Sequence, residues 1–146
     1  MQTPEENKEL ARRFVNAIFN DHDADYAMDA LSDDFVEHQP MPGMPPDKKG
    51  TVEQMRFFLQ SSPDIKAQIH DLIASGDRVA IRATYTGTDA GGFLPGMAPT
   101  NKRYSMEGMD IVRWGDDGKV LEHWGIVDAM SAMGQLGLLP PPGGGG

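Results

Sequence analysis

The sequence predicts an α+β protein in which N-terminal helices pack on a curved, mainly antiparallel sheet. Two patterns of apolar residues support this prediction. Up to Pro63, apolar residues recur every three or four positions, as on one face of a helix. From Ile65 to Val127, apolar and polar residues alternate, as in half-buried strands. A chain of 146 residues is long enough to form one domain with its own core.

The first helix has a clear start. Thr3 and Glu6 have the spacing of a capping box, and Pro4 occupies the first helical position, which needs no backbone N–H donor. An apolar stripe then continues to Phe19, so we expect the helix to end near that residue.

Two further helices are predicted before the sheet. A short helix is expected over residues 23–30, followed by a brief extended piece at 35–38. The prolines of residues 39–46 exclude a helix there and indicate a loop. We expect the third helix to begin at a second capping box, formed by Thr51 and Gln54.

The second half of the chain is predicted to form strands joined mostly by tight turns. The apolar phase shifts after Asp71, which indicates a bulge. A long glycine-rich loop is expected at 89–101, and Asp128 should cap a short final helix. The expected strands cover residues 65–74, 78–88, 103–114 and the stretch after the turn at 116–118. Residues 1–139 are therefore predicted to form the domain, and the Pro/Gly tail 140–146 to be disordered.

Composition narrows the possible partners. With 13 basic and 22 acidic residues, the net charge of −9 argues against nucleic acid and anionic membranes. The chain has no cysteine, which excludes disulfides, thiol nucleophiles and cysteine-ligated metals. It has no apolar run of membrane-spanning length and no secretory signal pattern, so a cytoplasmic protein is expected.

Several kinds of site are not supported by the sequence. The four histidines show no short-range ligand spacing, so no metal site is predicted. Gly91-Gly92 lacks the context of a phosphate-binding loop, and no nucleophile-elbow motif is present.

The last predicted strand carries the most informative residues. His123 and Trp124 are neighbours, and alternation along a strand makes them face opposite ways. If His123 faces inward, Gly125 and Val127 do so too. Across the hairpin, Asp110 should lie near His123, because cross-strand neighbours stand about 5 Å apart. An imidazole beside a carboxylate can transfer protons near neutral pH, so Asp110 and His123 are candidate catalysts. The alternative is a hydrogen-bonded pair that only shapes a pocket.

Two other sets of residues are assigned to surfaces of the predicted sheet. Trp114, Trp124 and Ile126 could form an outward apolar strip, which suggests a homo-oligomer interface. The expected substrate-binding residues are those that should line the inner face or its opening: His38, Tyr85, Tyr104, Met106 and Val127.

Several short pieces of sequence, spread over nearly the whole chain to Gly137, carry a family resemblance. In order they are Glu6-Asn7-Lys8 to Asn20, Asp34-Phe35-Val36-Glu37-His38 before Pro42-Gly43, Ile73 to Ala80, Gly87-Thr88 to Leu94, Pro99 to Arg103, and Gly118-Lys119-Val120 through His123-Trp124 to Asp128. The chain thereby resembles the SnoaL-like polyketide cyclases (ester cyclases) of the NTF2-like superfamily.

This resemblance implies a cone-shaped α+β barrel that forms a dimer or tetramer and uses no metal or organic cofactor. It also implies ring closure by an intramolecular aldol condensation, with an aspartate as acid/base two residues after the histidine of the last strand. That position is Gly125 here, so the aspartate that the resemblance implies has no counterpart at this place in the sequence. Asp110 stands where the cyclases carry a pocket histidine, and the resemblance places His38 at the mouth of the cone.

Three functions follow as hypotheses. The first is cofactor-free acid/base chemistry on a hydrophobic, polyketide-like carbonyl compound: aldol-type cyclisation, isomerisation or dehydration. The second is a non-catalytic protein that binds an apolar small ligand. The third is an epoxide hydrolase of the limonene type, which needs two aspartates bridged by an arginine. Asp110 and Asp128 are available for it, but Arg113 has the wrong strand parity to join Asp110.

Overall fold

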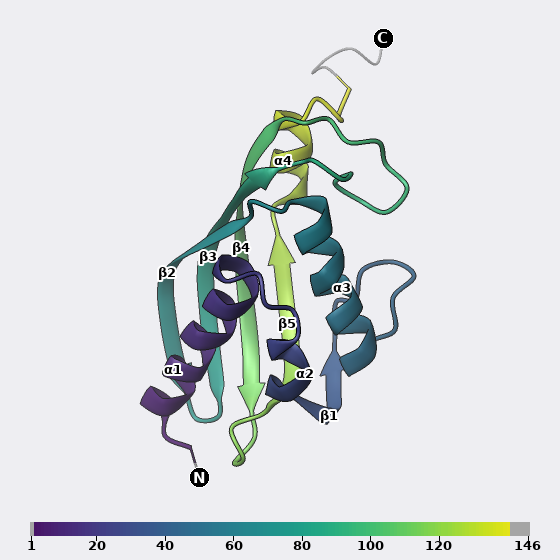
Figure 1. Ribbon diagram of the computed structural model, residues 1–146. Coiled ribbons are helices and arrows are strands. Elements are labelled where there is room, and N and C mark those ends of the chain that lie inside the picture. Colours follow the sequence, from purple (N-terminus) through teal and green to yellow (C-terminus); the bar gives the residue numbers. More distant parts are fainter. Residues whose placement is uncertain (1, 141–146) are drawn as a thin grey trace.

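The computed structural model describes residues 2–140, which form four α-helices and five strands (Figure 1). Most of the tail predicted to be disordered, residues 141–146, lies outside the described residues. In chain order the elements are α1 (Pro4–Val15) with a π-helical turn (Asn16–Asn20), α2 (Tyr26–Ala30), β1 (Leu31–Glu37), α3 (Lys48–Ser61), β2 (Lys66–Ser75), β3 (Arg78–Thr88), β4 (Arg103–Trp114), β5 (Val120–Val127) and α4 (Ala129–Gln135).

All five strands belong to one sheet, in the order β1-β5-β4-β3-β2. The pairs from β2 to β5 are antiparallel, whereas β1 runs parallel to β5. The predicted α+β class and mainly antiparallel sheet are confirmed. The extended piece expected at 35–38 is longer than predicted and forms the edge strand beside β5.

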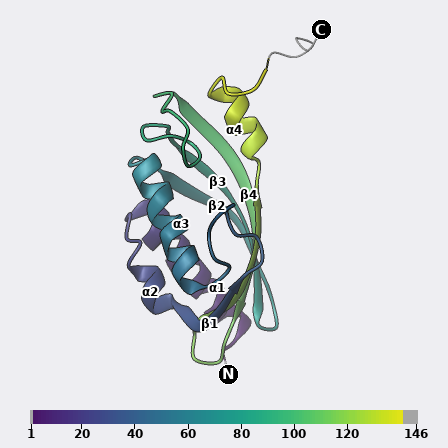
Figure 2. The same ribbon diagram turned by 90° about the vertical axis from the view of Figure 1, so that its right-hand side faces the viewer.

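The sheet is curved, and α1, α2 and α3 lie on its concave face (Figure 2). The buried core lies between these helices and the inward side chains of the sheet, and includes Ile18, Leu31, Val79 and Ala83. In Figure 2 no helix of the described chain covers the convex face of the central strands. None of the described helices combines the length and apolar character needed to cross a membrane.

The start of α1 agrees with the predicted capping box. Thr3 Oγ1 accepts a hydrogen bond from the Glu6 backbone N–H at 3.1 Å, and Glu6 Oε2 accepts one from the Thr3 backbone N–H at 2.8 Å. At the other end, Asn20 exchanges two hydrogen bonds with the backbone of Ala67. These bonds fix the first helix against β2.

The start of α3 was predicted wrongly. The helix begins at Lys48, and its N-cap is Asp47, whose Oδ1 accepts a hydrogen bond from the Gly50 backbone N–H at 2.9 Å. Thr51 and Gln54 therefore lie inside the helix and form no capping box. The proline-rich loop ends directly before Asp47, so the first residue able to cap a helix does so.

The sheet's irregularity and the last cap agree with the sequence. The register of β2 against β3 shifts between Ile69 and Asp71, where a bulge was predicted. Asp128 Oδ1 accepts a hydrogen bond from the Ser131 backbone N–H at 3.0 Å, so Asp128 caps α4.

Candidate active site

A cavity of about 290 Å³ lies between the concave face of the sheet and the helices. Its wall is mostly apolar, because the helices and strands both turn their apolar stripes toward it. Among the apolar residues that line it are Phe14, Phe19, Phe35, Met55, Phe58 and Ile81. Enclosed, mostly apolar cavities with a few converging polar groups are typical of small-molecule sites.

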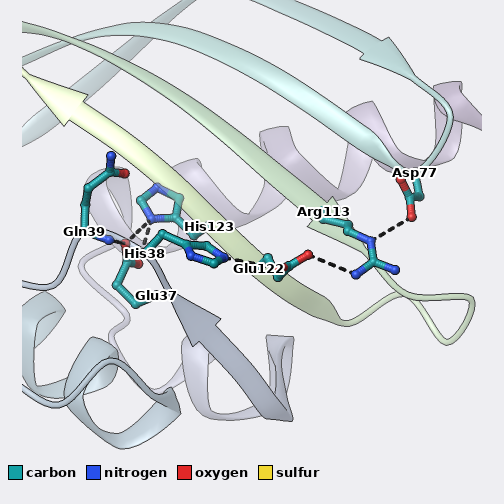
Figure 3. A network of polar contacts seen from close by, with 7 residues as sticks. All are labelled: Glu37, His38, Gln39, Asp77, Arg113, Glu122 and His123. Atoms are coloured by element: carbon teal, nitrogen blue, oxygen red, sulfur yellow. Dashed lines mark hydrogen bonds and ion pairs between the residues drawn. The ribbon is translucent and has the colours of Figure 1, made fainter.

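Three polar side chains of the wall form a hydrogen-bonded group. His123 Nδ1 lies 2.8 and 2.7 Å from the two carboxylate oxygens of Glu37, and His123 Nε2 lies 2.7 Å from Asp110 Oδ1. Figure 3 shows Glu37 and His123 together where β1 ends. The imidazole therefore bridges two carboxylates, one from each neighbouring strand of β5.

Strand register brings these three residues together. Glu37 is the parallel-sheet partner of His123, so their side chains leave the sheet on the same face. Asp110 is the antiparallel partner of Gly125, two residues beyond His123 on the same face. Gly125 has no side chain to occupy the space above it. A Cβ at position 125 would overlap Asp110 Oδ1 and lie 2.7 Å from His123 Cε1.

The two carboxylates control the charge of the imidazole. Burial by itself lowers the pKa of His123, but the hydrogen bonds to Asp110 and Glu37 outweigh burial and raise the pKa to about 9. At neutral pH the imidazole is therefore protonated and donates to both carboxylates. With the imidazolium between two carboxylates, the three side chains together carry one negative charge.

Among the three hydrogen-bonded side chains, Asp110 is the one that can contact a ligand. Its Oδ1 is held by His123, while its Oδ2 has no hydrogen-bond donor among the described residues. The Asp110 side chain is 16% exposed and lines the cavity, whereas the Glu37 side chain is only 4% exposed. Asp110 thus presents a free carboxylate oxygen, and Glu37 anchors the imidazole from behind.

Most of the predicted site residues do face the cavity: Asp110, His123, Tyr85, Tyr104, Met106 and Val127. Burial, followed by the charge of Asp110, raises the pKa of Tyr85, so its phenol stays neutral. Tyr104 is hydrogen-bonded through its hydroxyl to Ser62 Oγ at 2.7 Å, and burial raises its pKa.

His38 is the predicted substrate-binding residue that the structure places elsewhere. It follows Glu37 by one residue on an extended chain, so it turns to the convex face of the sheet. Its ring stacks on Trp124, with centroids 4.4 Å apart and planes 4° apart, and its Nε2 lies 3.1 Å from Glu122 Oε1. In Figure 3 His38 points toward Glu122 and away from His123. His38 is therefore not part of the cavity wall.

The alternation of side chains along β4 also decides which way Trp114 and Arg113 face. Trp114 was expected outside, but it lies four residues after Asp110, faces inward with it and is 3% exposed. Arg113 faces outward and forms ion pairs with Asp77 and Glu122, as Figure 3 shows. Arg113 therefore does not bridge Asp110 to a second aspartate, as a limonene-type hydrolase site would require.

Two functional candidates were missed in the sequence. Glu37 was overlooked in favour of His38, although the two residues are adjacent and must face opposite ways. Gln39 also lines the cavity, and its Oε1 accepts a hydrogen bond from the backbone N–H of Gly125. The local pattern gave no signal for either residue, because their positions depend on the parallel pairing of β1 with β5.

Fold and site together define a small α+β protein with an apolar cavity and an acid–imidazole–acid chain in its wall. A sequence model of the SnoaL-like polyketide cyclases matches residues 9–136, and the chain belongs to this family. Its predicted NTF2-like fold is thereby confirmed. No curated protein matches the chain in sequence.

Several solved structures are similar to it. AclR of Streptomyces galilaeus, provisionally described as a hydroxylase, has 30% identity and a TM-score of 0.81, over 94% of this chain and 100% of AclR. IdmH of Streptomyces antibioticus, provisionally described as a polyketide cyclase, has 28% identity and a TM-score of 0.77, over 90% of this chain and 99% of IdmH. TsrD of Streptomyces laurentii, at 24% identity, shares the fold with a TM-score of 0.82, over 95% of this chain and 100% of TsrD.

Proposed function

We propose that this protein is an enzyme that removes a proton next to a carbonyl group in a hydrophobic, polyketide-like small molecule. The observation that carries the proposal is the free Oδ2 of Asp110, held at the wall of an apolar cavity by an imidazole that Glu37 anchors. The family and the cyclase and hydroxylase descriptions of similar structures support an enzymatic role on this class of compound.

The proposed reaction starts with Asp110 as the base. Its Oδ2 takes the proton from the carbon next to the carbonyl, and the electron pair of the broken C–H bond moves into an enolate. In a cyclisation, the enolate carbon bonds to a second carbonyl carbon of the same molecule, and the resulting alkoxide takes the proton back from Asp110. In an isomerisation, the proton returns to another carbon. In a dehydration, it goes to the leaving hydroxyl group, which departs as water.

His123 and Glu37 are positioning residues in this scheme. The imidazolium keeps Asp110 oriented by its Oδ1 and offsets its negative charge, while Glu37 fixes the ring. When Asp110 has taken the proton, the charges of the His123 imidazolium and the Glu37 carboxylate balance each other, and the negative charge lies on the substrate oxygen. The apolar wall excludes water, which would otherwise protonate the enolate.

The test uses a probe that does not require the natural substrate. The protein is incubated with 2-tetralone, a bicyclic ketone, in D2O, and exchange of the hydrogens next to the carbonyl is followed by NMR. The wild-type protein should accelerate this exchange, and Asp110→Asn should reduce the acceleration by about 10²- to 10⁴-fold. Glu107→Gln, which removes an exposed carboxylate outside the cavity wall, serves as the control and should leave the rate unchanged. Full exchange activity in Asp110→Asn would refute Asp110 as the base.

A non-catalytic ligand-binding role is the second candidate. It is favoured by the fact that both ring nitrogens of His123 already have partners, as in a purely structural network. Binding of 2-tetralone in the cavity without faster exchange would select this role over the enzymatic one.

A further inference from the structure

The amide of Gln39 is fixed at the mouth of the cavity. Strand β1 ends at Glu37, and the Gln39 backbone N–H donates a hydrogen bond to Glu37 Oε1 at 3.1 Å. The side chain of Gln39 then reaches β5, where its Oε1 accepts the backbone N–H of Gly125. Figure 3 shows Gln39 beside Glu37 and His123 where β1 ends.

This contact determines which way the amide points. A backbone N–H can be accepted only by the oxygen of the amide, so the Nε2 group must point away from the Gly125 N–H. Nε2 carries two N–H donors, and neither meets an acceptor among the described residues. Gln39 is exposed at the cavity rim and contributes to its wall, so these donors are available to a ligand.

The free donors lie close to the proposed base. The carboxylate of Asp110 occupies the space directly above the Cα of Gly125, and the amide of Gln39 is bonded to the N–H of the same residue. Base and donor thus flank one glycine. Of the other polar groups in the wall, the Tyr104 hydroxyl is already paired with Ser62 Oγ. Gln54 Nε2, Thr51 Oγ1 and Trp114 Nε1 also lack a partner among the described residues, but Gln39 is the one bonded to the residue beside Asp110.

We infer that Gln39 Nε2 donates a hydrogen bond to the carbonyl oxygen of the substrate and stabilises the enolate oxygen that forms when Asp110 takes the neighbouring proton. This inference rests on the proposed function. A carbonyl oxygen and the hydrogen on its neighbouring carbon need one donor and one base side by side, and the two groups around Gly125 meet that need. Gln39 thereby selects substrates with a carbonyl oxygen at this point.

The inference is tested by binding of an oxyanion probe. Pentafluorophenol is ionised at neutral pH and presents an oxygen anion on an apolar ring, while hexafluorobenzene is its uncharged counterpart. The binding of both compounds is followed by ¹⁹F NMR in the Asp110→Asn variant. Its uncharged asparagine amide takes the place of the protonated Asp110 carboxyl. Gln39→Leu removes donors and acceptor, whereas Gln39→Glu keeps the acceptor for Gly125 and removes the donors.

Both Gln39 variants should bind pentafluorophenolate about 10- to 100-fold more weakly and hexafluorobenzene unchanged. The matched control is Gln54→Glu, which adds the same charge elsewhere in the cavity wall and should weaken the anion less than Gln39→Glu does. If Gln39→Leu weakens binding and Gln39→Glu does not, Gln39 is only an acceptor for Gly125 and the inference is wrong. An equal loss in Gln54→Glu would also overturn it. If hexafluorobenzene itself does not bind, the proposed apolar ligand site fails, and this inference fails with it.

Discussion

The carboxylate of Asp110 occupies the space that a side chain at position 125 would need. The two residues are direct partners across β4 and β5, and a Cβ on Gly125 would overlap Asp110 Oδ1. The family resemblance places the catalytic acid of the cyclases at the position of Gly125. In this chain a carboxyl group reaches the same part of the cavity from the neighbouring strand, and the glycine makes room for it.

The first prediction concerns the steric conflict between a side chain at position 125 and the carboxylate of Asp110. Gly125→Ala should destabilise the protein by about 1–3 kcal/mol, because the added methyl group overpacks the site. In an Asp110→Gly background the same change should cost much less, since the colliding carboxylate is absent. Urea unfolding of the wild-type protein, the two single variants and the double variant measures this coupling as a double-mutant cycle. Gly134→Ala in α4 is the control: its Cβ would meet only ordinary contact at 3.9 Å, so it should be neutral or stabilising. Additive effects of the two site changes would contradict the overlap.

The second prediction concerns pH. The pKa of His123 is about 9 in the folded protein, against 6.5 for an unperturbed imidazole. Because the folded pKa is the higher one, the stabilisation is complete below pH 6.5 and is lost as the pH rises toward and through 9. The free energy of unfolding should fall by an amount on the order of 3 kcal/mol across this interval. His123→Gln should lack this part of the slope.

NMR titration of the His123 ring provides the direct measurement. Glu37→Gln and Asp110→Asn should each lower its pKa, because each removes one carboxylate from the imidazolium. A ring that titrates near pH 6.5 in the wild-type protein would contradict the proposed charge state.

The third prediction concerns Asp89, which is fully buried in the loop between β3 and β4. Its carboxylate accepts hydrogen bonds from the Gly92 N–H at 3.0 Å and from the N–H and hydroxyl of Thr100, both at 2.9 Å. Asp89→Ala leaves three donors without this acceptor and should cost on the order of 3 kcal/mol in thermal or urea unfolding. The loop also brings Phe93 to the cavity wall, so ligand binding should weaken as well. The exposed Asp33→Ala is the control, with an expected change under about 0.5 kcal/mol.

The fourth prediction concerns the homo-oligomer expected from the sequence. A row of outward residues crosses four paired strands: Ile73, Ala80, Ile111 and Trp124. Ile73 is 67% exposed, and Ile126 in the adjacent row is 71% exposed. If two copies pair through this face, Ile126→Asp should shift the protein to a monomer in sedimentation experiments. Met28→Asp on the helical side should leave the oligomer intact. If the wild-type protein is a monomer even at high concentration, the predicted homo-oligomer is wrong.

Much of the fold could be predicted because it depends on local pattern. The alternation in residues 78–88 and 103–114 gave the strands β3 and β4, and the capping residues gave α1 and α4. The hairpin between β4 and β5 then placed Asp110 and His123 on one face. These relationships need only the chain geometry of neighbouring residues.

Contacts between distant parts of the chain were decided by the tertiary structure. Glu37 meets His123 across 86 positions of sequence, through a parallel pairing that no local pattern reveals. Because neighbouring residues of a strand face opposite ways, this pairing points Glu37 into the cavity and His38 to the convex face. The sequence by itself thus determined the elements and the Asp110–His123 pair. The second carboxylate, the cavity and the orientation of Gln39 depend on how the edge strand docks, since docking sets the register between elements that periodicity leaves free.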